Sequence, residues 1–156
     1  NSYTLTLMVL YFLCHTGAVP YITPAPQRVD QLPPMPEYQP NRKGGGDMPW
    51  EEVHQRLAQF LEFYAAWPPG AVVSLVHPPA SAPLAKADMD GLTVAADQFC
   101  VQDPFLLDFN TARNISSMTW RGIKKCFAKA AVLVKEDPAA LFRPLPPKAD
   151  PWRSLR

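Results

Sequence analysis

Two adjacent residues near the start of the chain, Ser2 and Tyr3, have side chains suited to holding a nucleotide. They precede an apolar stretch, which runs to Leu13 and is typical of a helix. A tyrosine ring offers a flat face on which any nucleic-acid base can stack. A serine at a helix start can donate its hydroxyl and backbone N–H to a phosphate oxygen. The competing interpretation is structural, with Ser2 as the helix N-cap and Tyr3 as a core aromatic residue.

A second group of polar residues lies in the loop 102–116, which reads QDPFLLDFNTARNIS. Asp103 and Arg113 carry opposite charges at an interval of ten residues, with aromatic residues between them. They could contact a ligand, or they could form an ion pair that holds the loop in shape. The two interpretations are compatible.

The segment after this loop carries basic residues at regular intervals. Arg121, Lys125 and Lys129 are spaced by four residues, which places them on one face of a helix. Such a face could contact the phosphate backbone of a nucleic acid. A charged stripe opposite an apolar one is also the ordinary solvent-facing side of a helix, so spacing alone does not separate the two interpretations.

Three stretches together resemble the RNA terminal nucleotidyltransferases, the tailing enzymes that include terminal uridylyltransferases and cytoplasmic-type poly(A) polymerases. They are the apolar segment 1–13, the loop 102–116, and the segment LAQFLEFY at 57–64 with VVSLV at 72–76. The resemblance covers most of residues 1–135 and implies the central and PAP-associated C-terminal region. It implies the following nucleotide-binding residues: Ser2, Tyr3, Asp103, Phe109 and Arg113. It also makes RNA the expected contact of the basic stripe.

The loop departs from the uridylyl-adding branch of this family at two positions. That branch has a Glu and a His that read the base edge, where this chain has Leu106 and Phe109. Asp108 is nearby and could substitute, and the string 110–113 resembles the adenylyl-adding branch. Discrimination between bases needs a polar group at their edge. We therefore expect a weakly selective pocket, or one that prefers ATP, with UTP or ATP as the substrate.

The resemblance implies that the catalytic carboxylates lie outside this chain. No Gly-Ser followed by an Asp pair occurs, and the sequence begins at Asn1 without an initiator Met. We expect Mg²⁺ or Mn²⁺ to be held by a missing N-terminal catalytic domain, which adds AMP or UMP to an RNA 3′ end. This piece would supply the base platform and the lid of the nucleotide cleft, and would be inactive alone. The alternative is a non-catalytic helical scaffold whose Pro-rich loops bind partners.

The composition is that of a globular protein without a strong charge bias. A length of 156 residues, of which 47% are hydrophobic, fits one domain or slightly more, and the net charge of +1 means that any RNA contact must be local. The three cysteines and three histidines have no metal-ligand spacing, which argues against zinc and indicates reduced thiols. We expect an intracellular location, cytoplasmic rather than nuclear or mitochondrial. The apolar run 5–13 is too short to span a membrane, which needs about 20 residues, so we expect no membrane contact.

The predicted fold class is α+β and mainly helical: a helix bundle with a small two-stranded sheet and long Pro-rich loops. We expect an all-round apolar helix at 2–15, an amphipathic helix capped by Asp47 and ending before Pro68, and a third at about 116–135. The expected strands are 72–76 and 99–101. The helical domain would comprise 1–135, with a Pro/Gly-rich insert at 20–49 and a loop at 78–91. The segment 136–156 would be a weakly ordered Pro-rich tail.

Overall fold

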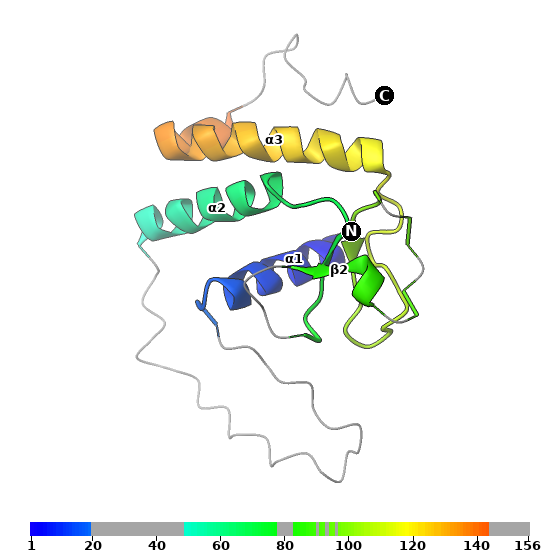
Figure 1. Ribbon diagram of the computed structural model, residues 1–156. Helices are drawn as coiled ribbons and strands as arrows, with labels where there is room; N and C mark the ends of the chain where they lie inside the picture. Colours follow the sequence, from blue (N-terminus) through cyan, green and yellow to red (C-terminus); the bar gives the residue numbers. More distant parts are fainter. Residues whose placement is uncertain (20–48, 78–82, 90, 93, 96, 144–156) are drawn as a thin grey trace, which may run out of the picture.

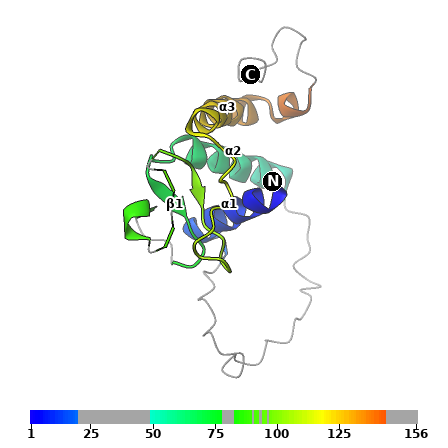
Figure 2. The ribbon, with the colours of Figure 1, turned by 90° about the vertical axis from the view of Figure 1, so that its right-hand side faces the viewer.

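The computed structural model describes residues 1–19, 49–77, 83–89, 91–92, 94–95 and 97–143. In this part of the chain three α-helices, α1 (Ser2–His15), α2 (Trp50–Ala65) and α3 (Ser117–Glu136), lie one above another in the order α1, α2, α3 (Figure 1). Figure 2 shows the same order after a quarter turn. A small sheet packs on α1, at the end of the layers where the chain begins. The prediction of a mainly helical α+β fold is confirmed.

Both ends of α1 are closed by local hydrogen bonds. Asn1 is the N-cap, since its side-chain oxygen accepts a bond from the backbone N–H of Tyr3 at 2.9 Å. At the other end Gly17 has a φ of 71°, a conformation that glycine adopts without strain. The amides of Gly17 and Ala18 donate to the carbonyls of Cys14 and Leu13, at 3.1 and 2.9 Å. This pair of hydrogen bonds is a Schellman motif, which ends the helix at the glycine.

Only one face of α1 is covered by the rest of the described chain. Leu7, Met8, Tyr11 and Phe12 are among its buried residues, while the other face is exposed at residues that include Leu5, Val9 and Leu10. The helix is apolar on every side, as expected, but the described chain covers one face of it. The buried residues recur at intervals of three and four, which places them on a single face.

Helices α2 and α3 pack on each other along their lengths (Figure 1). The N-cap of α2 is Pro49, without a side-chain bond; Asp47, which we expected as the cap, lies outside the described residues. Ser116 caps α3 by accepting a bond from the amide of Thr119 at 3.1 Å. The apolar stripe of α3 faces the core, with these residues buried or packed against it: Trp120, Ile123, Phe127, Ala130, Ala131 and Val134.

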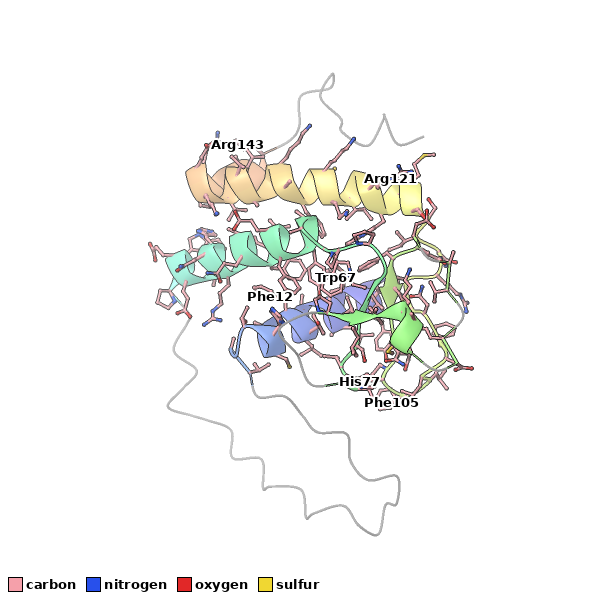
Figure 3. The ribbon with its side chains drawn as sticks, viewed as in Figure 1. Phe12, Trp67, His77, Phe105, Arg121 and Arg143 are labelled. Atoms are coloured by element: carbon pink, nitrogen blue, oxygen red, sulfur yellow. The ribbon has the colours of Figure 1, made fainter. Side chains whose placement is uncertain are left out.

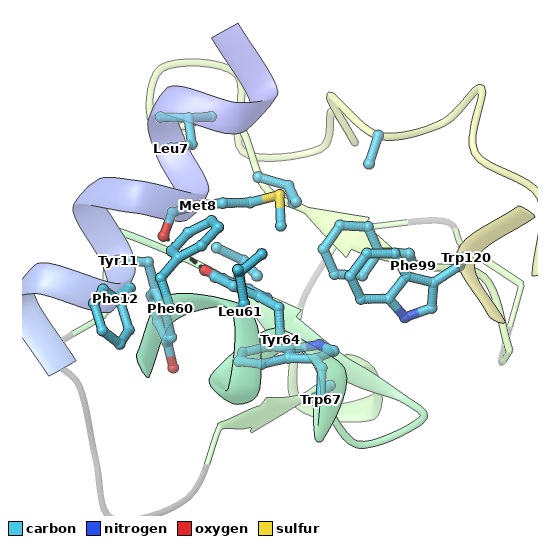
Figure 4. Packing of buried hydrophobic residues seen from close by; sticks show 14 of the residues in the cluster. Leu7, Met8, Tyr11, Phe12, Phe60, Leu61, Tyr64, Trp67, Phe99 and Trp120 are labelled. Atoms are coloured by element: carbon cyan, nitrogen blue, oxygen red, sulfur yellow. Dashed lines mark hydrogen bonds between the residues drawn. The ribbon is translucent and has the colours of Figure 1, made fainter. Parts of the chain in front are cut away.

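The core between α1 and α2 is built mostly from aromatic rings (Figure 4). Tyr11 meets Trp67 edge-on at 5.6 Å, and Phe12 meets Phe60 in the same way at 5.6 Å. The fully buried Tyr64 donates its hydroxyl to the carbonyl of Met8 at 2.7 Å. Burial raises the pKa of Tyr64 well above its usual value. Rings in these geometries attract each other beyond the area that they bury.

The sheet has three strands, not two: β1 (Ala71–Val73), β2 (Leu84–Ala85) and β3 (Cys100–Val101), in the order β2-β1-β3. Strands β1 and β3 pair in parallel, which confirms the two predicted strands. The extra strand, β2, pairs antiparallel with β1 and comes from the segment that we expected to be a loop. β1 is also shorter than predicted, because the hydroxyl of Ser74 accepts a bond from the amide of Val76 at 3.2 Å. Such local bonds compete with strand pairing.

Two short 3₁₀ helices complete the described chain: η2 (Lys86–Asp88) follows β2, and η3 (Pro138–Phe142) packs on α3. Helix α3 ends at Asp137, where proline follows, as predicted. Residues 20–48 and 144–156, which contain most of the predicted insert and tail, lie outside the described residues. The division into a domain and a tail stays a prediction.

Candidate functional site

Tyr3 and Asp103, two of the five residues predicted to bind a nucleotide, meet in the structure. The phenol of Tyr3 lies close enough to the carboxylate of Asp103 for that charge to act on it. Desolvation, and secondly the negative charge of Asp103, raise the pKa of Tyr3 above its usual value. Tyr3 is 39% exposed, so it is not the core aromatic residue of the structural interpretation.

Asp103 is held by the backbone of its own loop. Its Oδ1 accepts the backbone N–H groups of Phe105 at 2.8 Å and Leu106 at 3.1 Å, a turn that aspartate often forms. The residue is only 8% exposed. A buried carboxylate needs such donors, because leaving it unpaired is costly. Asp103 thus acts as the centre of the turn that follows β3.

The two arms of this loop pair antiparallel through their backbones, and this pairing determines which side chains lie on the same face. Gln102 and Asn110 form an isolated bridge, and the amide of Asp103 donates to the carbonyl of Phe109 at 3.0 Å. Neighbouring residues in a ladder point to opposite faces. Asp103 and Phe109 therefore share the face opposite to Gln102 and Asn110. Because Asp103 reaches Tyr3, Phe109 lies on the Tyr3 side of the loop.

Arg113 lies on the ring of Phe109. Its guanidinium carbon is 4.5 Å from the ring centroid, within the range of a cation–π contact. No ion pair joins Arg113 to Asp103, two residues that the structure describes. The interpretation of the two as an ion pair is therefore wrong. The loop keeps its shape through backbone bonds and a ring contact instead.

Ser2 stands beside Tyr3 at the start of α1 and is exposed. Its carbonyl accepts a hydrogen bond from the hydroxyl of Thr6 at 3.0 Å. The N-cap is Asn1, so the interpretation of Ser2 as the cap is wrong. The structure thus brings Tyr3, Asp103, Phe109 and Arg113 together in a chain of contacts, with Ser2 at its edge.

Sequence reasoning missed the buried polar residues that hold this loop. Asn110 accepts bonds from the amides of Val101 at 3.0 Å and Ala112 at 2.9 Å, and donates to the carbonyl of Phe99 at 3.1 Å. The bond to the residue two positions on is typical of asparagine, and this signal could have identified Asn110. Thr4 ties α1 to the same loop, since its hydroxyl donates to the carbonyl of Thr111 at 3.1 Å.

The tip of the loop is apolar and exposed. Phe105 is 84% exposed, and Leu106 and Leu107 are exposed beside it. Asp108, which we considered as a substitute reader of the base, is also exposed. Figure 3 shows Phe105 at the opposite side of the molecule from Arg121.

The basic stripe of α3 is exposed along its length. Arg121, Lys125 and Lys129 are all accessible, and within the described residues none of them has an ion-pair partner. Two other lysines of α3 are used structurally: Lys124 donates to the carbonyl of Trp67 at 3.2 Å, and Lys135 pairs with Glu62 of α2. No contact joins the stripe to the Tyr3 side of the loop, so its role in binding RNA stays a prediction.

The described residues contain no group of three or more His, Cys, Asp or Glu placed to hold a metal ion. The cysteines at positions 14, 100 and 126, all within the described residues, form no disulfide bond. Burial raises the pKa of the Cys100 thiol to about 11, against a smaller opposite effect of Lys86. None of the described helices is both long and apolar enough to cross a bilayer.

Comparison with known proteins finds one relative in both sequence and structure. The chain is 24% identical over 143 residues to terminal uridylyltransferase 4 of Trypanosoma brucei brucei, covering 83% of this chain and 41% of that protein. Solved structures of the Trypanosoma brucei enzyme with bound GTP and with bound dUTP superpose with TM-scores of 0.61 and 0.62 at 23% identity. Each covers 86% of this chain, and 47% and 56% of the solved chains. No family model matches.

These comparisons confirm the resemblance that the motifs indicated. The fold of the described chain is that of part of a terminal uridylyltransferase, and the chain spans less than half the length of the curated relative. The loop and helix that carry Asp103 and Tyr3 are among the elements on which the resemblance was first based.

Proposed function

We propose that this chain is part of an RNA terminal nucleotidyltransferase that adds UMP or AMP to RNA 3′ ends, and that it supplies the platform for the nucleotide base and the lid of the nucleotide cleft. The observation that carries the proposal is the contact between Tyr3 and Asp103, which come from the start of α1 and the loop after β3. The family resemblance rests partly on these two motifs. They are about one hundred residues apart in sequence, and they lie close together in space.

The geometry suits a base platform. The Tyr3 ring is partly exposed, and its phenol lies near Asp103, whose carboxylate is fixed by two backbone amides. An exposed ring at this place offers its face for stacking with a base. Ser2, at the start of the same helix, is positioned to donate to a phosphate oxygen.

The metal ions of the reaction are assigned to residues outside this chain, and the RNA to a surface of this chain. The transfer needs Mg²⁺ or Mn²⁺ to stabilise the attacking and leaving oxygens. The described residues do not form a site for these ions, so we assign them to carboxylates of an N-terminal catalytic domain. The RNA 3′ end would approach along a basic surface, for which the exposed stripe at Arg121, Lys125 and Lys129 is the candidate. We assign the activity to the inside of the cell, to the cytoplasm rather than to the nucleus or mitochondria.

Primer extension by the full-length protein tests the platform. Tyr3→Ala should raise the KM for the nucleotide about 5- to 150-fold, which corresponds to roughly 1–3 kcal/mol of base stacking. Tyr3→Phe should have a smaller effect, because it keeps the ring face and loses only the hydroxyl. The matched control is Trp50→Ala, which removes an exposed aromatic ring at the start of α2 and should leave KM unchanged.

The 156-residue chain assayed alone should extend no RNA primer with any nucleotide, in either Mg²⁺ or Mn²⁺. Robust extension by this chain would disprove the assignment of the catalytic carboxylates to another domain. A full-length protein that binds no nucleotide and extends no primer would favour the alternative, a non-catalytic scaffold that binds partners.

A further inference from the structure

We infer that Lys86 and Gln98 are positioning residues for the nucleotide site, and that they act in series on the arm 109–113 of the loop after β3. Neither residue lies in the motifs that carry the family resemblance. The inference rests on the proposed function, because that arm would line the nucleotide cleft. It goes beyond that function, since it assigns part of the support of the site to the segment between β2 and β3.

Gln98 holds the arm 109–113 from outside the loop. Its side-chain amide donates to the backbone carbonyl of Arg113 at 2.7 Å. The side chain of Arg113 lies on Phe109, 4.5 Å from the ring centroid, and the carbonyl of Phe109 accepts the amide of Asp103 at 3.0 Å. The bond from Gln98 therefore fixes the backbone that carries the guanidinium, on the arm that pairs with Asp103.

The backbone of Gln98 is itself fixed on both sides. Its amide donates to the carbonyl of Ala95 at 3.0 Å, and its carbonyl accepts a hydrogen bond from the ammonium group of Lys86. The next residue, Phe99, is buried and stacks on Trp120 with the ring centroids 3.6 Å apart. The Gln98 side chain thus reaches Arg113 from a backbone that has little freedom to move.

Lys86 links this turn to the sheet. Its ammonium group donates to the carbonyls of Ala95, at 2.7 Å, and of Gln98, and its backbone amide donates to the carbonyl of Gly70 at 2.9 Å, directly after β2. An ammonium has three donors, and hydrogen bonds from a charged donor are stronger than those between neutral groups. Lys86 therefore closes the turn 95–98 and ties it to the edge of the sheet.

The two side chains form a path of hydrogen bonds from the sheet to the nucleotide site: Lys86 to the Gln98 carbonyl, and the Gln98 side chain to the Arg113 carbonyl. If either bond is lost, the arm 109–113 occupies its binding position for a smaller fraction of the time. The apparent affinity for a ligand falls with that fraction. Once the nucleotide is bound the arm is in place, so KM should rise while kcat is unchanged.

The test measures KM for the nucleotide and kcat separately, in primer extension by the full-length protein. Gln98→Met and Lys86→Met remove the donors and keep the length of the side chains. Each should raise KM about 2- to 10-fold, the net contribution of one hydrogen bond, and leave kcat and the KM for the RNA primer unchanged. Lys86→Arg should restore most of the wild-type KM, because it keeps a charged donor.

The double variant tests whether the two residues act in series. Residues that share one path are not additive, so Lys86→Met combined with Gln98→Met should raise KM no more than the larger single effect. Gln98 is half-buried, and Gln98→Met tests the inference even where Lys86→Met does not fold. The matched control is Lys124→Met, which removes a lysine of α3 that also donates to a backbone carbonyl, that of Trp67 at 3.2 Å, and should leave KM unchanged.

Three results overturn the inference alone: an unchanged KM in Gln98→Met, the same rise in Lys124→Met, or additive effects in the double variant. A purely structural role would give the first of these, with a lower temperature of unfolding and less active enzyme. A wild type that adds no nucleotide overturns the proposed function, and the inference with it.

Discussion

Between α1 and α2 the chain buries aromatic rings, whereas in residues 102–113 it buries amides and a carboxylate. In the first region the contacts are ring edges and faces, together with one hydroxyl bond from Tyr64 to the Met8 carbonyl. In the second region Asn110 makes three bonds to the backbone, and Asp103 accepts two backbone amides.

The aromatic core and the polar loop differ in how well they tolerate amino-acid substitutions. Apolar packing depends on volume and shape, so swaps that conserve volume usually cost less than about 1.5 kcal/mol. A buried hydrogen bond depends on the identity of both partners, and the loss of one leaves the other unpaired. The aromatic core therefore supports the molecule, while the polar loop fixes the positions of Tyr3, Phe109 and Arg113.

Truncating the core should have the largest effect. Trp120 stacks on Phe99 with centroids 3.6 Å apart and planes at 12°, and both are buried. Trp120→Ala should lower the free energy of unfolding of the 156-residue chain by about 3–5 kcal/mol. Urea denaturation measures this, with Leu61→Met as a volume-conserving control that should cost less than about 1.5 kcal/mol. Similar costs for both would show that the core is not closely packed.

Removing the central amide of the loop should come next. Asn110→Ala leaves the amides of Val101 and Ala112 and the carbonyl of Phe99 without their side-chain partner. We expect a loss of about 2–4 kcal/mol of unfolding free energy, given about 1–3 kcal/mol for each unpaired buried group and partial relaxation. The exposed Asn114→Ala serves as the control. If the two substitutions cost the same, the loop is not held by its polar network.

The smallest effect is expected where the two kinds of contact meet, at Tyr64. Tyr64→Phe removes the bond to the Met8 carbonyl and keeps the ring, so it should cost about 1 kcal/mol near neutral pH. The folded-state pKa of Tyr64 is raised by burial above the unfolded value of about 10. The stability that this shift contributes is complete below pH of about 10 and is lost as the pH rises further. The free energy of unfolding, measured from neutral to alkaline pH, should therefore fall more steeply in wild type than in Tyr64→Phe.

The helices could be predicted from the sequence because their signals are local. The apolar spacing of α3, its Ser116 cap and the Gly17 motif at the end of α1 all lie within a few residues of the structure that they specify. Strand β2 could not be predicted, because two residues with no alternating pattern carry no periodic signal. They form a strand only because β1 lies beside them.

The sequence alone determined which residues are candidates for the site, through motifs at Ser2, Tyr3 and Asp103. Only the tertiary structure decided how they are arranged: Asp103 lies near the Tyr3 phenol and does not pair with Arg113, and Arg113 lies on Phe109. The physical reason is that a hydrogen bond or a ring contact depends on two groups within a few ångströms of each other. When those groups are far apart in sequence, as Tyr3 and Asp103 are, the packing of α1 against the loop after β3 sets the distance, and no local pattern records it.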